Sequence, residues 1–308
     1  MKIAIIGTGG VGAYFGGKMA KAGFDITFLA RGAHLKAIRE NGLTVRSILV
    51  DFHLDPVKAT DTIKEIGECD LIILAVKAWQ IKEIAEELKS IVGENSIILP
   101  LQNGVVAVEE LKAFFHEKNI ISGLCQIFSK IESPGVVNHF GVIPKITFGE
   151  LDNSTTIRIQ KIKQIFDTSG INSEISADIQ AALWKKFIPI CVSGLLAVSK
   201  TTYGELREIK ETRQMMVDLL NEIYRLSQKI GIQIETDFVD KAVAFIDTFP
   251  YETTSSLTRD VLEEKPSEIE YQNGTVVRLA QKYGVDVPVN RFVYNCILLM
   301  ELKIKKRE

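Results

Sequence analysis

The sequence KIAIIGTGGVG, at residues 2–12, decides the fold of the first half of the chain. Its apolar part, Lys2–Ile6, is typical of a buried strand, and its glycine-rich part, Gly7–Gly12, is typical of a tight turn. The stretch Val11–Ala22 then predicts a helix, which Gly23 ends. A strand, a glycine turn and a helix in this order predict an anion-binding loop at the helix N-terminus.

The loop matches the pattern G-x-G-x-x-G, which in this context is a fingerprint of dinucleotide binding. Gly7 permits the tight turn, Gly9 lets the backbone approach a pyrophosphate, and Gly12 lets the helix pack closely on the strand. A glycine turn can also serve structure alone, but the helix and the next strand both agree with dinucleotide binding. We therefore expect the whole loop to bind a cofactor: Gly7, Thr8, Gly9, Gly10, Val11 and Gly12.

The second strand, predicted at Asp25–Ala30, ends without the acidic residue that holds the ribose 2′-hydroxyl of NAD. Arg31 follows this strand, and its guanidinium suits a ribose 2′-phosphate. The alternative is that Arg31 is only a solvated charge at a strand end. The sequence favours NADP(H) over NAD(H) as the cofactor.

Strands and helices continue to alternate through the first half, as in a parallel sheet built from right-handed crossover units. Predicted strands at Leu71–Val76 and Ser96–Pro100 precede a strand group around the turn Ser133–Gly135. In the second half, apolar residues recur at intervals of three and four, which predicts helices. We predict an α/β fold in which an N-terminal Rossmann-type, doubly wound parallel sheet precedes a C-terminal all-helical domain. The predicted NADP-binding domain spans residues 1–169, and the helical substrate and catalytic domain spans residues 170–308.

The composition excludes several classes of protein. The 308 residues include 37 basic and 39 acidic ones, and the formal charge of −2 argues against binding to nucleic acid or a membrane surface. No segment reaches the ~18 consecutive apolar residues of a membrane-spanning helix. The 4 cysteines and 4 histidines are scattered, so we expect free thiols in a reducing cytoplasm and no metal site. The expected partner is a small molecule, and a homodimer is compatible with this composition.

Two adjacent lysines interrupt a mostly apolar stretch, Leu183–Leu196, which Pro189 is expected to kink. A reductase that acts on a carbonyl needs a proton donor, and a lysine on such a helix either reaches solvent or lines a polar cleft. Periodicity does not distinguish between Lys185 and Lys186, and two solvated lysines explain the pattern equally well.

Polar residues at two other places are further candidates. Asn103 follows the last strand of the predicted sheet, at the carboxyl edge where ligands bind, although an ordinary Asn-Gly turn explains it equally well. Pro266 is expected to open a helix that runs to Tyr283, with Glu268 in its first turn. Ser256 would lie on the preceding helix, and the turn between them could bring Ser256 and Glu268 to one cleft. Alternatively, Glu268 complements a helix dipole and Ser256 is a surface hydroxyl.

At these residues the sequence resembles the ketopantoate reductase (2-dehydropantoate 2-reductase) family, over nearly the whole chain. The glycine loop is common to many dehydrogenases, whereas the later motifs, in their order, are much more specific. These motifs are Lys77-Ala78-Trp79-Gln80, Gln102-Asn103-Gly104, Trp184-Lys185-Lys186, Gly204-Glu205-Leu206, Ser255-Ser256-Leu257 and Ser267-Glu268-Ile269-Glu270 with Asn273-Gly274. The W-x-K pattern of the family lies on Lys186.

The resemblance implies a reaction and a role for each site residue. Lys186 would be the general acid, and Glu268 would hold the lysine, the substrate and the cofactor in position in an interdomain site. Asn103 would lie between nicotinamide and substrate, Ser256 would bind the substrate, and Lys77 would lie beside the cofactor. The reaction implied is hydride delivery from NADPH to the C2 carbonyl of 2-dehydropantoate, giving (R)-pantoate for pantothenate and coenzyme A synthesis.

Three positions depart from asparagines that some family members carry: Ile190, Tyr203 and Thr253. Fewer amides would weaken polar binding of the substrate by ~1 kcal/mol per hydrogen bond. These positions motivate one alternative, an NADPH-dependent reductase of a different branched or bulky 2-oxo acid. The other alternative, from a different class, is a non-catalytic protein that senses NADP(H), which would have no need of the lysine, serine and glutamate together.

Overall fold

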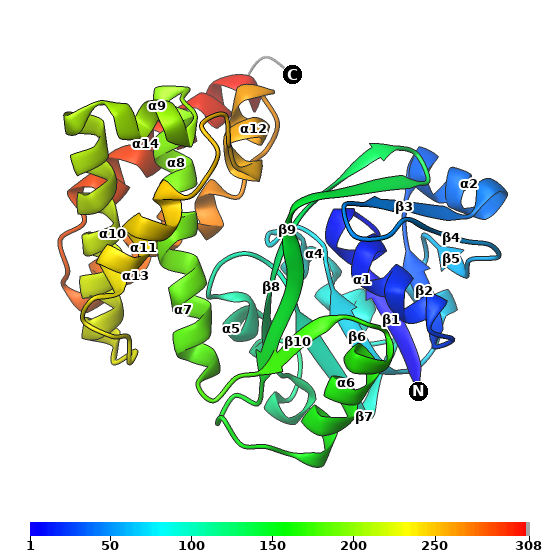
Figure 1. The fold of residues 1–308 in the computed structure, drawn as a ribbon. Coiled ribbons are helices and arrows are strands. Elements are labelled where there is room, and N and C mark those ends of the chain that lie inside the picture. Colours follow the sequence, from blue (N-terminus) through cyan, green and yellow to red (C-terminus); the bar gives the residue numbers. More distant parts are fainter. Residues whose placement is uncertain (306–308) are drawn as a thin grey trace. The chain divides into compact units, whose positions relative to one another are not determined.

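The computed structural model describes residues 1–305, which form two compact units (Figure 1). Unit 1 comprises Met1–Gln102 and Ala107–Ile179, and unit 2 comprises Asn103–Val106 and the residues from Gln180 onward. Strands dominate unit 1 and helices make up unit 2, so the predicted fold class is confirmed. The predicted boundary between residues 169 and 170 lies inside unit 1, and the predicted first domain includes Asn103–Val106, which belongs to unit 2.

A parallel sheet of five strands in the order β5-β2-β1-β6-β7 forms the centre of unit 1. Its strands are β1 (Lys2–Ile6), β2 (Asp25–Leu29), β5 (Ala59–Thr60), β6 (Cys69–Leu74) and β7 (Val92–Pro100). On β1, Ile3 and Ile5 belong to one apolar core, and Ala4 and Ile6 belong to another. Because such a sheet is buried on both faces, its strands are continuous apolar runs, which explains the sequence of residues 2–6.

Helices pack against both of these cores. The helix α1 (Gly10–Lys21) contributes to the first core, and α4 (Gln80–Leu88) contributes to the second. The other helices that alternate with these strands are α2 (Gly32–Asn41), α3 (Ile63–Ile66) and α5 (Ala107–Lys112). The strand order reverses between β1 and β6, and in such sheets ligands bind at the carboxyl ends of the strands that flank this point.

A second sheet in unit 1 has the order β10-β9-β3-β4, and β8 also pairs with β9. Its strands are β3 (Leu43–Ser47), β4 (Phe52–Leu54), β8 (Ser122–Ser133), β9 (Val136–Gly149) and β10 (Asn172–Ile175), with the 3-10 turn η1 (Glu117–Asn119) before β8. The long hairpin of β8 and β9 is visible in Figure 1. β10 follows the helix α6 (Ile157–Thr168) and pairs in parallel with β9, which is why unit 1 continues to Ile179.

Unit 2 consists of helices. They are α7 (Ile179–Ile190), α8 (Val192–Ser199), α9 (Tyr203–Glu208), α10 (Lys210–Ile230), α11 (Phe238–Asp247), α12 (Ser256–Leu262), the 3-10 turn η2 (Ile269–Tyr271), α13 (Asn273–Tyr283) and α14 (Pro288–Lys305). The break between α7 and α8 follows Pro189, as predicted. Within residues 1–305, only Ile179–Ser199 is long and apolar enough to cross a membrane, and 67% of its apolar window is buried, as in the core helix of a globular domain.

Candidate active site

The two adjacent lysines of α7 have different partners. Lys185 forms an ion pair with Glu235, with 2.6 Å between Nζ and Oε2. Lys186 is half-buried, and its Nζ donates a hydrogen bond to Asn103 Oδ1 at 2.9 Å. The structure therefore distinguishes the two side chains, which helical periodicity alone left equivalent.

Asn103 reaches Lys186 because the short segment Asn103–Val106 packs in unit 2. The next residue, Gly104, has a φ of +104°, and a Cβ at this position would lie 3.0 Å from the carbonyl oxygen of Tyr271. A side chain here would be both strained and crowded, so the Asn-Gly pair is required for this close approach. On its other side, Asn103 Nδ2 donates to Glu268 Oε2 at 3.2 Å.

Lys186, Asn103 and Glu268 thus form one hydrogen-bonded group, which we call the Lys–Asn–Glu array. Glu268 is only 5% exposed. A carboxylate accepts hydrogen bonds but does not donate them, so it orients the amide of Asn103 with Nδ2 toward Glu268 and Oδ1 toward Lys186. An ammonium held in this way is a directed donor that can polarise a carbonyl and give up a proton.

The prediction that Pro266 opens the helix up to Tyr283 is wrong. Glu268 precedes η2, and α13 begins only at Asn273. The physical reason lies in the backbone: Gln272 has a ψ of −103°, which is not helical, and the amide of Ser267 donates to the Glu301 side chain instead of entering a helix.

Ser256 is the exposed first residue of α12. The preceding residue, Ser255, caps this helix by accepting a hydrogen bond from the amide of Thr258 at 3.0 Å. Within residues 1–305, no hydrogen bond joins Ser256 to the Lys–Asn–Glu array. The structure therefore joins three of the predicted site residues by hydrogen bonds, and the role of Ser256 stays a prediction.

The glycine loop of unit 1 meets the geometric requirements of a pyrophosphate cradle. Gly7 has a φ of +100°, which favours glycine, and a Cβ on Gly12 would lie 2.0 Å from the carbonyl oxygen of Gly7. By contrast, a Cβ on Gly9 would meet no atom within 4 Å. The loop is thus closed toward the sheet and open in front of the N-terminus of α1, where an anion is stabilised.

Thr8 has a structural contact that the sequence pattern did not indicate. Its side chain is 4% exposed, and both its hydroxyl and its amide donate to the carbonyl oxygen of Leu29, at 2.8 and 3.1 Å. These bonds hold the loop to the end of β2. Val11 is half-buried against the apolar core that contains Ile3 and Ile5. Gly10 lies against the backbone of Ser129 on β8.

The two predicted cofactor-binding cations follow strands of the same sheet. Arg31 is exposed and lies between β2 and α2. Lys77 follows β6, and its Nζ is 5.7 Å from the centroid of the Trp79 ring. The carboxyl ends of parallel strands share one edge of a sheet, so Arg31, Lys77 and the glycine loop all lie at the edge where dinucleotides bind.

Gln102, the first residue of the Gln102-Asn103-Gly104 motif, also contributes to this edge. Its side chain is 6% exposed, and Nε2 donates to the carbonyl oxygens of Leu74 and Val76 at 2.9 and 3.1 Å. These contacts tie the segment after β7 to the end of β6.

His34 is a residue that the sequence did not single out. The amide of Gly135 donates to His34 Nδ1 at 3.0 Å, so the ring must be neutral at this nitrogen. Burial lowers the pKa of His34. A neutral His34 therefore accepts a hydrogen bond from the turn between β8 and β9.

The positions that depart from the family pattern differ in their surroundings. Tyr203 is buried in the helical core, with its ring T-shaped against Phe249, and burial raises its pKa to about 12. Its amide donates to the carbonyl oxygen of Thr253, which is half-buried. Ile190 is half-buried one helical turn after Lys186. Of the three, Ile190 is the one whose place on α7 puts an apolar side chain on the face of the lysine.

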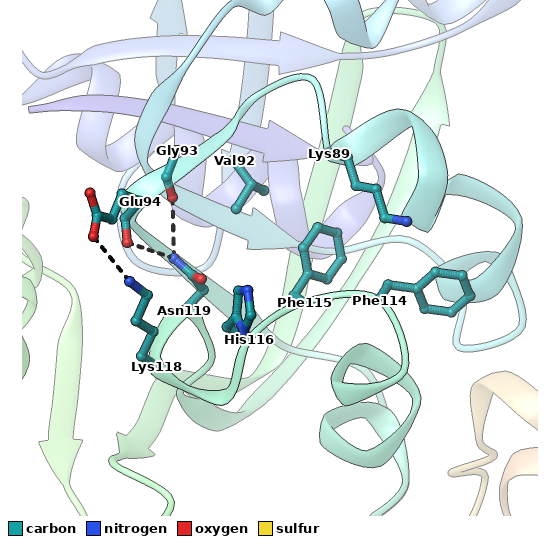
Figure 2. Close-up of a pocket in the computed structure, with 9 residues that line it drawn as sticks. All are labelled: Lys89, Val92, Gly93, Glu94, Phe114, Phe115, His116, Lys118 and Asn119. Carbon is teal, nitrogen blue, oxygen red and sulfur yellow. Dashed lines mark hydrogen bonds and ion pairs between the residues drawn. The ribbon is translucent and has the colours of Figure 1, made fainter.

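Unit 1 also has a hollow of about 330 Å³, shown in Figure 2. Its polar lining is internally paired: Lys118 contacts Glu94, and Asn119 donates to the carbonyl oxygens of Gly93 and Glu94. Val92, which also lines it, is the first residue of β7, so the hollow lies at the amino end of that strand. The glycine loop follows the carboxyl end of β1, at the opposite edge, so this hollow is not part of the predicted cofactor site.

Comparison with known proteins identifies the chain. A family model described as "Ketopantoate reductase PanE/ApbA" matches residues 3–153, and one described as "Ketopantoate reductase PanE/ApbA C terminal" matches residues 178–301. A 2-dehydropantoate 2-reductase of Nostoc sp. is 31% identical, over 97% of this chain and 95% of the relative. An uncharacterized oxidoreductase of Bacillus subtilis, YkpB, is 28% identical, over 98% and 99%.

Solved structures agree with these matches. The crystal structure of 2-dehydropantoate 2-reductase from Geobacter metallireducens GS-15 has a TM-score of 0.91 and 29% identity, covering 97% of this chain and 99% of that one. The chain is an oxidoreductase that acts on a CH–OH group or the corresponding carbonyl. It belongs to the ketopantoate reductase PanE/ApbA family.

Proposed function

We propose that the chain reduces the C2 carbonyl of 2-dehydropantoate to (R)-pantoate with NADPH, a step of pantothenate and coenzyme A synthesis. The Lys–Asn–Glu array carries this proposal, because it presents an oriented ammonium to a carbonyl. The name of the Nostoc relative, 2-dehydropantoate 2-reductase, supports the choice of substrate.

In this mechanism Lys186 is the general acid. Its ammonium donates to the carbonyl oxygen and then protonates the alkoxide that forms there. Asn103 holds Nζ of Lys186 through Oδ1, and Glu268 keeps Asn103 in the required orientation. Bound NADPH supplies the hydride. The exposed hydroxyl of Ser256 binds the carboxylate or hydroxyl of the substrate.

Residues of unit 1 would hold the cofactor. The open space in front of Gly9 and the N-terminus of α1 suit the pyrophosphate. Arg31, exposed after β2, would pair with the 2′-phosphate, and this expected pairing is the reason to propose NADPH instead of NADH. Lys77, after β6, would lie beside the bound cofactor.

Steady-state oxidation of NADPH, and separately of NADH, with 2-dehydropantoate as substrate tests the proposal. We expect the protein to oxidise NADPH when 2-dehydropantoate is present. We expect kcat/KM to be higher with NADPH than with NADH. Absence of turnover with 2-dehydropantoate and with every other 2-oxo acid, together with retained NADPH binding, would instead indicate a protein that senses NADP(H).

A second candidate function is reduction of a different branched or bulky 2-oxo acid. The observation that favours it is Ile190, an apolar side chain one turn from Lys186. A comparison of kcat/KM for 2-dehydropantoate and a panel of branched and aromatic 2-oxo acids separates the two candidates. A higher kcat/KM for a panel member than for 2-dehydropantoate would assign that 2-oxo acid as the substrate and leave the proposed reaction type unchanged.

A further inference from the structure

The segment Ser267–Glu270, which carries Glu268, is attached to α14 at two points. Before Glu268, the amide and the hydroxyl of Ser267 both donate to Glu301 Oε1, at 3.0 and 2.6 Å. After Glu268, the carboxylate of Glu270 accepts a hydrogen bond from the Tyr294 hydroxyl at 2.6 Å. We call Glu301 and Tyr294 the α14 anchors.

The two anchors contact both ends of the segment from one helix. Tyr294 and Glu301 are seven residues apart on one helix, which places them on the same face about 10 Å apart along the axis. The segment from Ser267 to Glu270 runs into the first two residues of η2 and is shorter than this, and the side chains of Glu301, Glu270 and Tyr294 span the difference. The helix is a rigid element, so it defines where each end of the segment lies.

Further contacts restrict the segment at Glu270. Arg278 on α13 forms an ion pair with the Glu270 carboxylate, and its Nη2 donates to the Glu270 carbonyl oxygen at 2.8 Å. The carbonyl oxygen of Glu268 itself accepts hydrogen bonds from the amides of Tyr271 and Gln272, each at 3.0 Å. The main chain of Glu268 therefore has little freedom to shift.

The position of Glu268 matters because its contact with Asn103 is a single hydrogen bond of 3.2 Å. A shift of the segment by an ångström would break this bond and release the amide of Asn103 to rotate. Lys186 would then face Nδ2 instead of Oδ1, and two donors repel. Within residues 1–305, no hydrogen bond joins the α14 anchors to the array, so an effect of the anchors on the array passes through the segment Ser267–Glu270.

We propose that Glu301 and Tyr294 are positioning residues for catalysis, which act by holding Glu268 in register with Asn103 and Lys186. This inference rests on the proposed function of the Lys–Asn–Glu array. Glu301 fixes the segment before Glu268 and Tyr294 fixes it after Glu268, so loss of either anchor loosens the array without removing any of its members.

The test at Glu301 compares two substitutions. Glu301→Ala removes the acceptor of both Ser267 donors, and we expect kcat to fall on the order of 10- to 100-fold, as for a misplaced catalytic group. Glu301→Gln keeps a carbonyl-type acceptor at this position, so it should retain kcat within about threefold of the unmodified protein. The dissociation constant for NADPH should stay unchanged in both, because the glycine loop lies in unit 1.

The test at Tyr294 removes one hydroxyl group. Tyr294→Phe should lower kcat by about tenfold with little change in KM, whereas the control Tyr224→Phe, on α10 outside the anchors, should have no effect. Amide hydrogen exchange of residues 266–272 gives a readout that does not depend on turnover. Faster exchange there in Glu301→Ala and Tyr294→Phe, but not in Glu301→Gln, is the expected result.

Two results would overturn the inference. One is unchanged exchange and unchanged kcat in Glu301→Ala and Tyr294→Phe. The other is an equal loss of kcat in Glu301→Gln and Glu301→Ala, which would assign the effect to the charge of Glu301. If the unmodified protein reduces no 2-oxo acid, the proposed function fails, while the exchange measurement still decides whether the anchors hold the Glu268 segment.

Discussion

The glycine loop of unit 1 and the Lys–Asn–Glu array of unit 2 are assembled in opposite ways. The loop is one uninterrupted run, Gly7–Gly12, whose shape follows from local backbone geometry. The array joins Lys186 to Asn103 across 83 positions of sequence, and Asn103 to Glu268 across 165. The loop is therefore sensitive to added volume at single glycines, whereas the array is sensitive to any change in the elements that carry it.

Among the changes that leave Lys186 in place, the largest effect is expected at the residue that connects the other two. Asn103→Ala removes both hydrogen bonds of the array, and we expect kcat to fall on the order of 100-fold because the general acid loses its orientation. NADPH affinity should change little. The matched control is Asn221→Ala on α10, which removes a side-chain bond to a carbonyl oxygen of the same unit and should leave kcat unchanged. Similar kcat values for both variants would show that the array is not catalytic.

The glycine loop should respond differently at two of its positions. A Cβ on Gly12 would lie 2.0 Å from the Gly7 carbonyl oxygen, so Gly12→Ala should lower the free energy of unfolding by about 1–3 kcal/mol and also impair NADPH binding. A Cβ on Gly9 meets no atom within 4 Å, so Gly9→Ala should fold normally. It should nevertheless weaken NADPH binding by about tenfold, or 1.4 kcal/mol, because the new methyl group occupies the space proposed for the pyrophosphate. Chemical denaturation and NADPH titration of both variants check this; unimpaired NADPH binding by Gly9→Ala would contradict it.

A smaller and more selective effect is expected at Arg31. Arg31→Ala should weaken NADPH binding by about tenfold, since a charge-assisted contact to the 2′-phosphate contributes roughly 1.5–3 kcal/mol, and should leave NADH binding unchanged. Arg225→Ala, an exposed arginine of α10, serves as the control for a general change in charge. The measurement is the ratio of the two dissociation constants, and an equal loss for both cofactors would remove the argument for NADPH.

The sequence predicted the local elements of the fold better than the contacts between distant segments. Strand β1 was predicted at its observed bounds, and the helix after the loop to within one residue at each end, because local periodicity determines both. Asn103 was assigned to the first domain, since nothing in its neighbourhood shows that Asn103–Val106 packs in unit 2. The prediction that a helix starts at Pro266 was wrong because the Ser267 amide donates to Glu301, which lies 34 residues away and is not visible in the local pattern. Family resemblance, and not periodicity, distinguished Lys186 from Lys185.

The smallest predicted effect concerns pH and unit 1. Burial lowers the pKa of His34 below its usual value of 6.5, and the protonated ring cannot accept the hydrogen bond from Gly135. The unfolded chain therefore binds this proton more readily, so the stability contributed by neutral His34 is present above pH 6.5 and is lost as the pH falls through the lowered pKa. The free energy of unfolding, measured by denaturation at several pH values below 6.5, should fall less steeply in His34→Gln than in the unmodified protein. Parallel pH profiles would exclude this role.

The general acid is the central claim, and a single-turnover experiment tests it most directly. NADPH-loaded protein is mixed with 2-dehydropantoate, and the oxidation of bound NADPH is followed for the unmodified chain, for Lys186→Ala and for Lys185→Ala. Lys185, whose partner is Glu235, is the matched control on the same helix. We predict that Lys186→Ala binds NADPH but oxidises it on the order of 100- to 10,000-fold more slowly, while Lys185→Ala reacts at nearly the unmodified rate. Equal single-turnover rates for Lys186→Ala and the unmodified chain would contradict the account.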